Sequence, residues 1–150
     1  MMLYECGVRY ERTMPNGLSR KVTELYLVDA CSFAEAEGRI TKEMEPYISG
    51  DFEVVTIKRT NYSEIVENGA DSADKWFKAK LMFVTLDEKT AKEKKQAVYF
   101  IVKASDINNA HTVVVGHMKT TVVDYEIATL DETKIMDLFR YMVNKTSSNG

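Results

Sequence analysis

Apolar and polar residues alternate along the first segment of the chain, as they do in a half-buried β-strand. The apolar members stand at every second position: Tyr4, Cys6, Val8 and Tyr10 alternate with Glu5, Gly7, Arg9 and Glu11. Turn-forming residues follow at 14–17, and the apolar-rich segment 22–30 comes next. The pattern therefore predicts a β-hairpin at the start of the chain.

A helix and a third strand are predicted after this hairpin. Ser32 with Glu35 forms a capping box, which is typical of a helix N-terminus. The residues of the helix expected to form one buried stripe are Phe33, Ala36, Ile40 and Met44. Pro46 and Gly50 end the helix, and we expect the third strand over residues 52–62.

The second half of the chain repeats these patterns about 74 residues later. Residues 51–57 read DFEVVTI and residues 124–130 read DYEIATL, with three identical positions at a spacing of 73. Strands are predicted at 76–86, 97–104 and 122–130, with a loop at 87–95. Asp106 is the expected N-cap of a second helix, and its apolar stripe matches the first: Ile107, Ala110, Val114 and Met118. Segment 134–141 fits either a strand or a short helix.

We therefore predict an α+β fold built from a duplicated β-β-α-β unit. A unit of about 70 residues buries its helix and sheet face poorly alone. The two copies, at about 3–66 and 76–139, are expected to be related by a pseudo-twofold axis. They would form one compact domain over 1–143 with mostly antiparallel sheet. We expect residues 67–75 to be an exposed loop and 144–150 a flexible tail.

Composition narrows the class of protein. The chain has 150 residues, 45% of them hydrophobic, with a net charge of −3 and two cysteines. No apolar run is long enough to span a bilayer, and the N-terminus lacks the pattern of a secretion signal. We expect a cytoplasmic protein with reduced cysteines and no membrane partner.

Catalytic motifs are missing from the sequence. Phosphate-binding glycine loops and nucleophile elbows do not occur, and His111 and His117 are spaced too far apart for a helical metal pair. Cys6 and Cys31 are expected to be structural. We therefore expect no enzymatic activity, no cofactor and no metal.

Two acidic pairs recur at the repeat spacing: Asp51 with Glu53, and Asp124 with Glu126. Residues two apart on a strand share a face, so each pair could hold a hard cation or carry out acid–base chemistry. Because both copies have the pair, we favour a shared architectural role.

Charge placement offers the best indication of a binding site. Residues 75–103 contain eight lysines and three acids. Trp76, Lys78 and Lys80 share one face of a predicted strand, and a solvated face of this kind can stack a base and contact phosphates. With Arg9, Lys58 and Arg59 these residues form our candidate site for single-stranded nucleic acid or a nucleotide-like anion. The alternative role of the lysines is to keep a sheet edge from pairing with other chains.

Two other functions stay open. The chain could be a structural or interaction protein, such as a phage component or a homo-oligomer. It could also be a phage protein that sequesters a nucleotide signal at the seam between the two copies.

Several segments resemble a family of small Bacteroidetes and phage proteins known only as domain of unknown function 4494. The segments that carry the resemblance are 4–11, 23–30, 32–37 and 124–127. It extends from about Tyr4 to Tyr141, with Arg140 where the family pattern has a proline. The resemblance implies a bacterial or phage-infected host cytoplasm, and it brings no catalytic residues.

Overall fold

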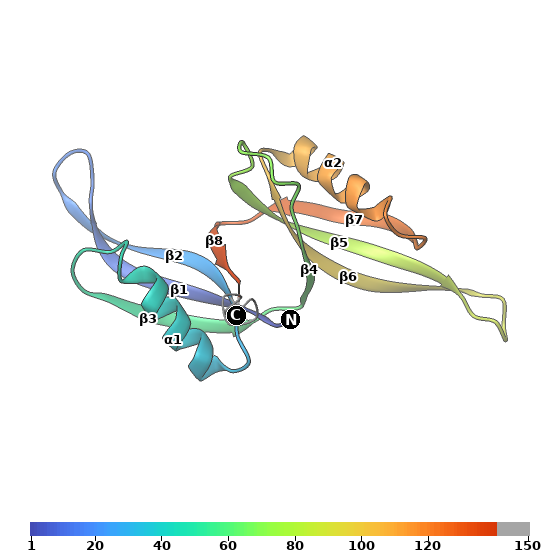
Figure 1. Cartoon of the computed structure of the whole chain (residues 1–150), viewed down its shortest axis with the longest axis horizontal. Coiled ribbons are helices and arrows are strands. Elements are labelled where there is room, and N and C mark those ends of the chain that lie inside the picture. The colour runs from blue at the N-terminus through green and yellow to red at the C-terminus, as the bar shows by residue number, and fades with distance from the viewer. Residues whose placement is uncertain (141–150) are drawn as a thin grey trace, which may run out of the picture. The chain divides into compact units, whose positions relative to one another are not determined.

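The computed structural model describes residues 1–140 and shows a mixed α+β fold (Figure 1). The described residues contain two helices and eight strands, of which the first five elements are β1 (Leu3–Thr13), β2 (Ser19–Asp29), α1 (Phe33–Met44), β3 (Phe52–Arg59) and β4 (Tyr62–Val66). The remaining five are β5 (Lys75–Leu86), β6 (Glu93–Ala104), α2 (Ile107–Met118), β7 (Asp124–Glu132) and β8 (Ile135–Phe139). Each predicted helix and strand has a counterpart in the structure, but the predicted strand over 52–62 is two strands, β3 and β4, and segment 134–141 forms a strand, β8, in its described part.

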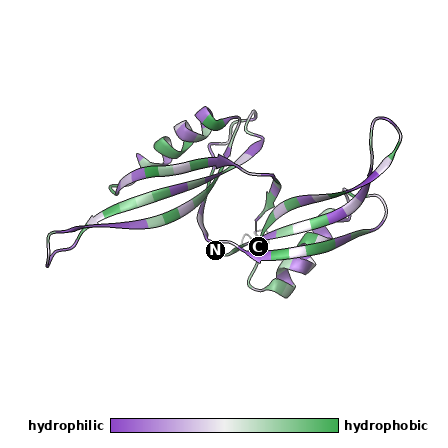
Figure 2. Cartoon of the chain, turned by 180° about the vertical axis from the view of Figure 1, so that it is seen from behind, coloured by the Kyte–Doolittle hydropathy of each residue, from purple (hydrophilic) through white to green (hydrophobic). Residues whose placement is uncertain are grey.

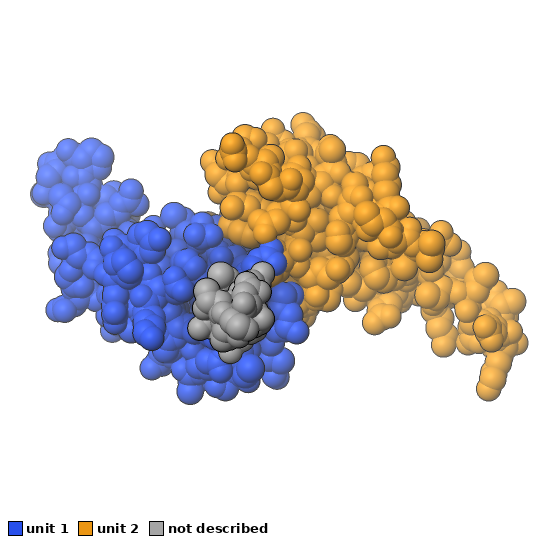
Figure 3. Space-filling view, viewed as in Figure 1, with its two compact units in different colours: residues 1–60, 135–150 blue, residues 61–134 orange. Residues whose placement is uncertain are grey.

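The chain divides into two compact units, coloured separately in Figure 3. Unit 1 comprises Met1–Thr60 and Ile135–Gly150, and unit 2 comprises Asn61–Lys134. Each unit has one four-stranded sheet, with the order β3-β1-β2-β8 in unit 1 and β4-β6-β5-β7 in unit 2. These boundaries differ from those of the predicted repeats, because β4 and β8 each join the sheet of the other half of the chain.

In unit 1, β1 and β2 form a long antiparallel hairpin, and α1 packs on one face of the sheet. Gly17 closes the turn with φ +84°, a left-handed conformation that glycine adopts without strain. The Ser32 side chain accepts a hydrogen bond from the Glu35 backbone N–H, as the capping box predicts. The core of unit 1 lies between helix and sheet, and its buried residues are Tyr4, Cys6, Val8, Val28, Ala30, Ala36, Ile40 and Met44.

Unit 2 repeats this arrangement with β5, β6 and α2. The predicted N-cap is confirmed, because the Asp106 side chain accepts a hydrogen bond from the Asn109 backbone N–H. Alternation of apolar and polar residues is visible along the strands in Figure 2. The buried residues of the unit 2 core are Val66, Phe77, Ala79, Leu81, Phe100, Val102, Ala104, Ala110, Val113, Val114 and Met118.

Two equivalent hydrogen bonds connect the residue after β3 to β1, and the residue after β7 to β5. Thr60 donates from its backbone N–H and its hydroxyl to the Leu3 carbonyl, at 3.0 and 2.7 Å. Thr133 donates in the same way to the Trp76 carbonyl, at 2.9 and 2.8 Å. Each threonine therefore ends its edge strand at the start of the central strand.

The fourth strand of each sheet comes from the other half of the chain. β4 pairs in parallel with β6, and β8 pairs in parallel with β2, whereas the other strand pairs are antiparallel. The predicted strand over 52–62 is therefore wrong in one respect. β3 ends at Arg59, and Tyr62 begins a separate strand in the other unit.

Chain reach explains this exchange of strands. To pair with β2, a strand that follows β3 must start on the far edge of the sheet, three strand spacings or about 14 Å away. From Arg59 to Tyr62 the chain spans at most about 11 Å. β3 and β2 also run in the same direction, so the chain would have to return along the sheet as well. A two-residue link cannot do this, and the same holds for the link between β7 and β8.

Two details of the prediction need correction. Phe33 and Ile107, the first members of the helix stripes, are about half exposed rather than buried. Both lie in the first turn, beyond the edge of the packed face, and the Phe33 ring meets Tyr4 edge-on at 5.0 Å. The strands β2 and β6 also begin earlier than predicted, because both arms of each hairpin pair almost to the turn.

The segment between β4 and β5 contains no helix or strand. Most of its residues are exposed, whereas Ala73 is buried. The predicted tail at 144–150 lies outside the described residues.

Candidate nucleic-acid interface

One face of the unit 2 sheet gathers lysines and aromatic rings, on the side away from α2. Strand alternation puts Lys78 and Lys80 of β5 on this face, because Phe77, Ala79 and Leu81 enter the core. On β6, Tyr99 lies opposite Lys80, and Lys103 lies opposite Trp76. We call Lys78, Lys80, Lys103 and Tyr99 the basic face.

Two of the three lysines of the basic face contact aromatic rings. The Lys78 Nζ lies 5.0 Å from the centre of the Tyr99 ring, and the Lys103 Nζ lies 5.5 Å from that of Trp76. Ion pairs found within residues 1–140 involve none of the three lysines of the basic face. Their positive charge is therefore available to an anion.

Trp76 does not lie on a solvated face, contrary to the prediction. Its side chain lines up with Lys78 as expected, but the residue is only 4% exposed. Lys103 lies over its ring. A base cannot stack on an indole that is buried to this extent, so the Trp76 ring is not available for stacking.

The other predicted site residues belong to unit 1, where Arg9 and Arg59 each make a side-chain contact. Arg9 pairs with Glu53 at 3.9 Å between the charged atoms. The Arg59 Nε donates to the Met2 sulfur at 2.8 Å. Lys58 lies opposite Glu5 in the strand register. Within unit 1 the three cations are thus spread along β1 and β3 instead of forming one cluster.

The positions that carry lysine in unit 2 carry different residues in unit 1. Lys78 lies opposite Ile101 in its hairpin, and the matching position in unit 1, opposite Leu27, is Glu5. By the same comparison, the positions of Lys80 and Lys103 are occupied in unit 1 by Gly7 and Asp29. The basic face is therefore a property of unit 2.

The recurring acidic residues contact cations in both units. Glu53 pairs with Arg9, and Glu126 pairs with Lys95 at 3.3 Å. The first pair joins the adjacent antiparallel strands β1 and β3, whereas the second reaches across β5 from β6 to β7. Such contacts support the architectural interpretation of the glutamates.

The two cysteines differ in environment. Cys6 is buried on the core face of β1, and burial raises the pKa of its thiol to about 11, with Glu5 adding to the effect. Cys31 is exposed beside the N-cap of α1. Cys6 is therefore held as a neutral thiol, which is a poor nucleophile.

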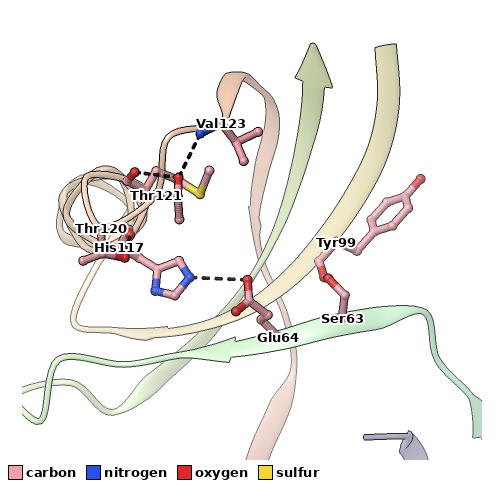
Figure 4. A network of polar contacts seen from close by, with 8 residues as sticks. Ser63, Glu64, Tyr99, His117, Thr120, Thr121 and Val123 are labelled. Atoms are coloured by element: carbon pink, nitrogen blue, oxygen red, sulfur yellow. Dashed lines mark hydrogen bonds and ion pairs between the residues drawn. The ribbon is translucent and has the colours of Figure 1, made fainter. Parts of the chain in front are cut away.

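Histidine takes part in one polar contact of unit 2. The His117 Nε2 lies 3.3 Å from a Glu64 carboxylate oxygen, which links the end of α2 to β4 (Figure 4). The His117 ring also meets Phe100 edge-on. In residues 1–140, His, Cys, Asp and Glu form no group of three or more that could hold a metal ion.

A shallow pocket in unit 1 was not anticipated from the sequence. It has a volume of about 420 Å³, and it lies where β1, β2 and the start of β3 meet. Its lining residues are Arg9, Tyr10, Glu11, Lys21, Asp51, Phe52 and Glu53. They come from three separate segments, and strand register alone brings them together.

The order of the strands and the packing of the helices define a class of protein: an α+β protein with two four-stranded sheets, each covered by one helix. The chain belongs to the family DUF4494, a domain of unknown function, which matches residues 2–141. No curated protein and no solved structure matches the chain. Neither helix in the described part is long and apolar enough to cross a membrane.

Proposed function

We propose that this protein is a binding module for single-stranded nucleic acid, and that the basic face of unit 2 contacts the phosphates. The observation that carries the proposal is the set of three lysines without carboxylate partners on two adjacent strands. Lys78 and Lys80 stand about 7 Å apart along β5, and Lys103 adds a third charge from β6. Phosphate contacts of this kind supply most of the affinity for nucleic acid without sequence preference.

Tyr99 gives the basic face an aromatic group that is partly open to solvent. The residue is of intermediate exposure, whereas Trp76 is buried. A tyrosine ring flanked by lysines can stack on a base in a sequence-tolerant way. In the proposed interface, Tyr99 therefore takes the role that the sequence suggested for Trp76.

The proposal can be tested by titrating a fluorescent oligo-dT with the full chain at about 50 and 200 mM salt. We expect binding that weakens steeply with salt. Replacing Lys78, Lys80 and Lys103 with alanine should lower the affinity at least tenfold. The slope of log K against log salt concentration should become shallower by about 2, because each phosphate contact contributes about 0.7 to this slope.

A matched control removes three exposed lysines elsewhere in unit 2: Lys89, Lys92 and Lys119. This variant has the same net charge as the first, and it should bind nearly as well as the unaltered chain. Equal loss in both variants would show that net charge alone is responsible. Absence of binding at the lower salt concentration would overturn the proposal.

We also propose that the chain arose by internal duplication. Support comes from the identical order of elements, the caps at Ser32 and Asp106, and the matching bonds of Thr60 and Thr133. A chain in which the five residues of β8 replace those of β4 should then still fold, with a modest loss of stability. Failure of this variant to fold would count against equivalent roles for the two strands.

The setting that we propose, the cytoplasm of a bacterium or a phage-infected host, depends on the resemblance noted in the sequence. Detection of the protein in the soluble fraction of its own source cells would test it.

A further inference from the structure

One edge of β2 pairs with a short strand, β8, that comes from the other half of the chain. Residues Leu25–Val28 pair with β8, and the rest of β2 extends beyond it towards the turn. Ile135 is buried at the start of β8, and the Phe139 ring stacks on Tyr26 at 5.9 Å between centroids. Docking of β8 thus combines main-chain hydrogen bonds with two apolar contacts.

None of these contacts depends on which chain supplies the strand. The segment that follows β3 cannot reach this edge, because its two-residue link is too short. A strand from the other half of a chain must therefore fill it. Every chain carries one such donor, β8, and one such edge on β2.

We infer that β8 also docks on β2 of a second copy of this chain, which gives a strand-exchanged dimer. The joint would be the same as the one within a single chain, so exchange needs no new interface. Thr133 and Lys134 form the link to β8, and because Thr133 is bonded to Trp76, the change of conformation would fall on Lys134. Because β8 must leave one sheet before it joins another, exchange should occur during folding rather than between folded chains.

Refolding of the full chain at two concentrations tests this inference. Closure within a chain is unimolecular and closure between chains is bimolecular. A tenfold higher chain concentration during refolding should therefore raise the ratio of dimer to monomer about tenfold. Both forms should persist after dilution in the absence of denaturant, as measured by gel filtration with light scattering.

A disulfide between β8 and β2 shows which chains are paired. Leu27 lies opposite Leu138 in the parallel register. Both native cysteines are first replaced, which gives a C6A/C31S background. Chains carrying only L27C and chains carrying only L138C are then refolded together and oxidised. We expect a covalent heterodimer after joint refolding, and none after mixing of chains that were folded separately.

Two controls keep the result interpretable. A chain with both cysteines, oxidised before unfolding, should refold only as a monomer, because its own β8 is tied to β2. The exposed Met136 lies on the same strand, so M136C in place of L138C tests the register and should crosslink several times less. Monomers at every concentration, or a dimer without the 27–138 crosslink, would overturn the inference. The concentration series with the unaltered chain decides the matter even where a cysteine variant fails to fold.

Discussion

At matching positions of their two sheets, unit 2 carries positive charge where unit 1 carries negative charge or none. Lys78, Lys80 and Lys103 of unit 2 correspond to Glu5, Gly7 and Asp29 of unit 1. At the matching positions of the core, both units instead have apolar residues. The comparison shows that strand register and helix packing are common to the units. On the face away from the helix, the matching residues Leu27 and Ile101 are buried in both units, whereas the charged positions beside them differ. An anion site in one unit therefore does not imply one in the other.

A second difference lies on the helix side of the sheet. Tyr26 donates a hydrogen bond to Glu24 at 3.2 Å in unit 1, and burial together with Glu24 raises the pKa of the Tyr26 phenol. The matching residues of unit 2 are Phe100 and Val98, which pack on its core. At these positions, unit 1 has a hydrogen bond between two polar side chains, whereas unit 2 has two apolar side chains that pack on its core.

The largest effect is expected where the units are most alike, at the end of each helix. Met44 and Met118 are 2% and 3% exposed. Met44→Ala and Met118→Ala should each lower the free energy of unfolding by about 2–5 kcal/mol, because each leaves a cavity in its core. Urea unfolding followed by circular dichroism measures both. The exposed Met136→Ala is the control, with a change within about 0.5 kcal/mol. A loss of stability in only one of the two variants would show that the helix ends do not have equivalent roles in the two units.

Cysteine reactivity distinguishes the buried position in unit 1 from an exposed one. Burial raises the pKa of Cys6 from 9.0 to about 11, so its thiolate fraction at pH 8 should be about a hundredfold below that of an ordinary thiol. The folded state favours the neutral thiol. This contribution to stability is complete below pH 9, and it is lost as the pH rises through 11.

Alkylation rates at pH 8, resolved by mass spectrometry, test this difference. Cys31 should react fast and Cys6 only when the protein unfolds. Equal rates in the absence of denaturant would contradict the burial of Cys6.

Copying a residue from one unit to the other tests the two outer faces. A Cβ at Gly7 would overlap the Thr56 hydroxyl, so Gly7→Lys should destabilise the protein by about 1–3 kcal/mol. The reverse change, Lys80→Gly, should cost only about 0.5–1 kcal/mol, from the flexibility of glycine. Thermal unfolding of the two variants compares them. If Gly7→Lys were as stable as the unaltered chain, close packing would not be the reason for glycine at this position.

The smallest effect is expected at the helix caps. Ser32→Ala and Asp106→Ala each remove one side-chain acceptor from a helix N-terminus. Each should lower the free energy of unfolding by about 1 kcal/mol. Ser32→Asp serves as a rescue variant that restores the acceptor. A loss in Ser32→Asp equal to that in Ser32→Ala would show that the cap bond is not the cause.

Local patterns were enough to predict most of the fold. The caps, the helix stripes and the alternation along β1 and β5 depend on residues close in sequence. The exchanged strands were missed for the opposite reason. Only five residues form β4, and its partner β6 begins 27 residues after β4 ends. Nothing in a short apolar segment tells which edge it will join, and only the reach of the two-residue link decides that.

The candidate site shows a similar limit. Alternation correctly placed Lys78 and Lys80 on one face, but it could not tell that Trp76 on the same face is covered. Alternation also left out Lys103 and Tyr99, which reach the face only through the register of β5 with β6. A search for lysines opposite aromatic residues across the predicted hairpin could have found them.

The central claim, that each half of the chain completes the sheet of the other, is tested most directly by cutting the chain between β4 and β5. A protease site is placed in the exposed segment 67–72, and I65C/I101C in the C6A/C31S background joins β4 to β6. After cleavage, the two halves should co-elute without denaturant, and oxidation should join them through the 65–101 disulfide. Halves that separate without denaturant, or that stay together but never form this disulfide, would contradict the exchange of strands.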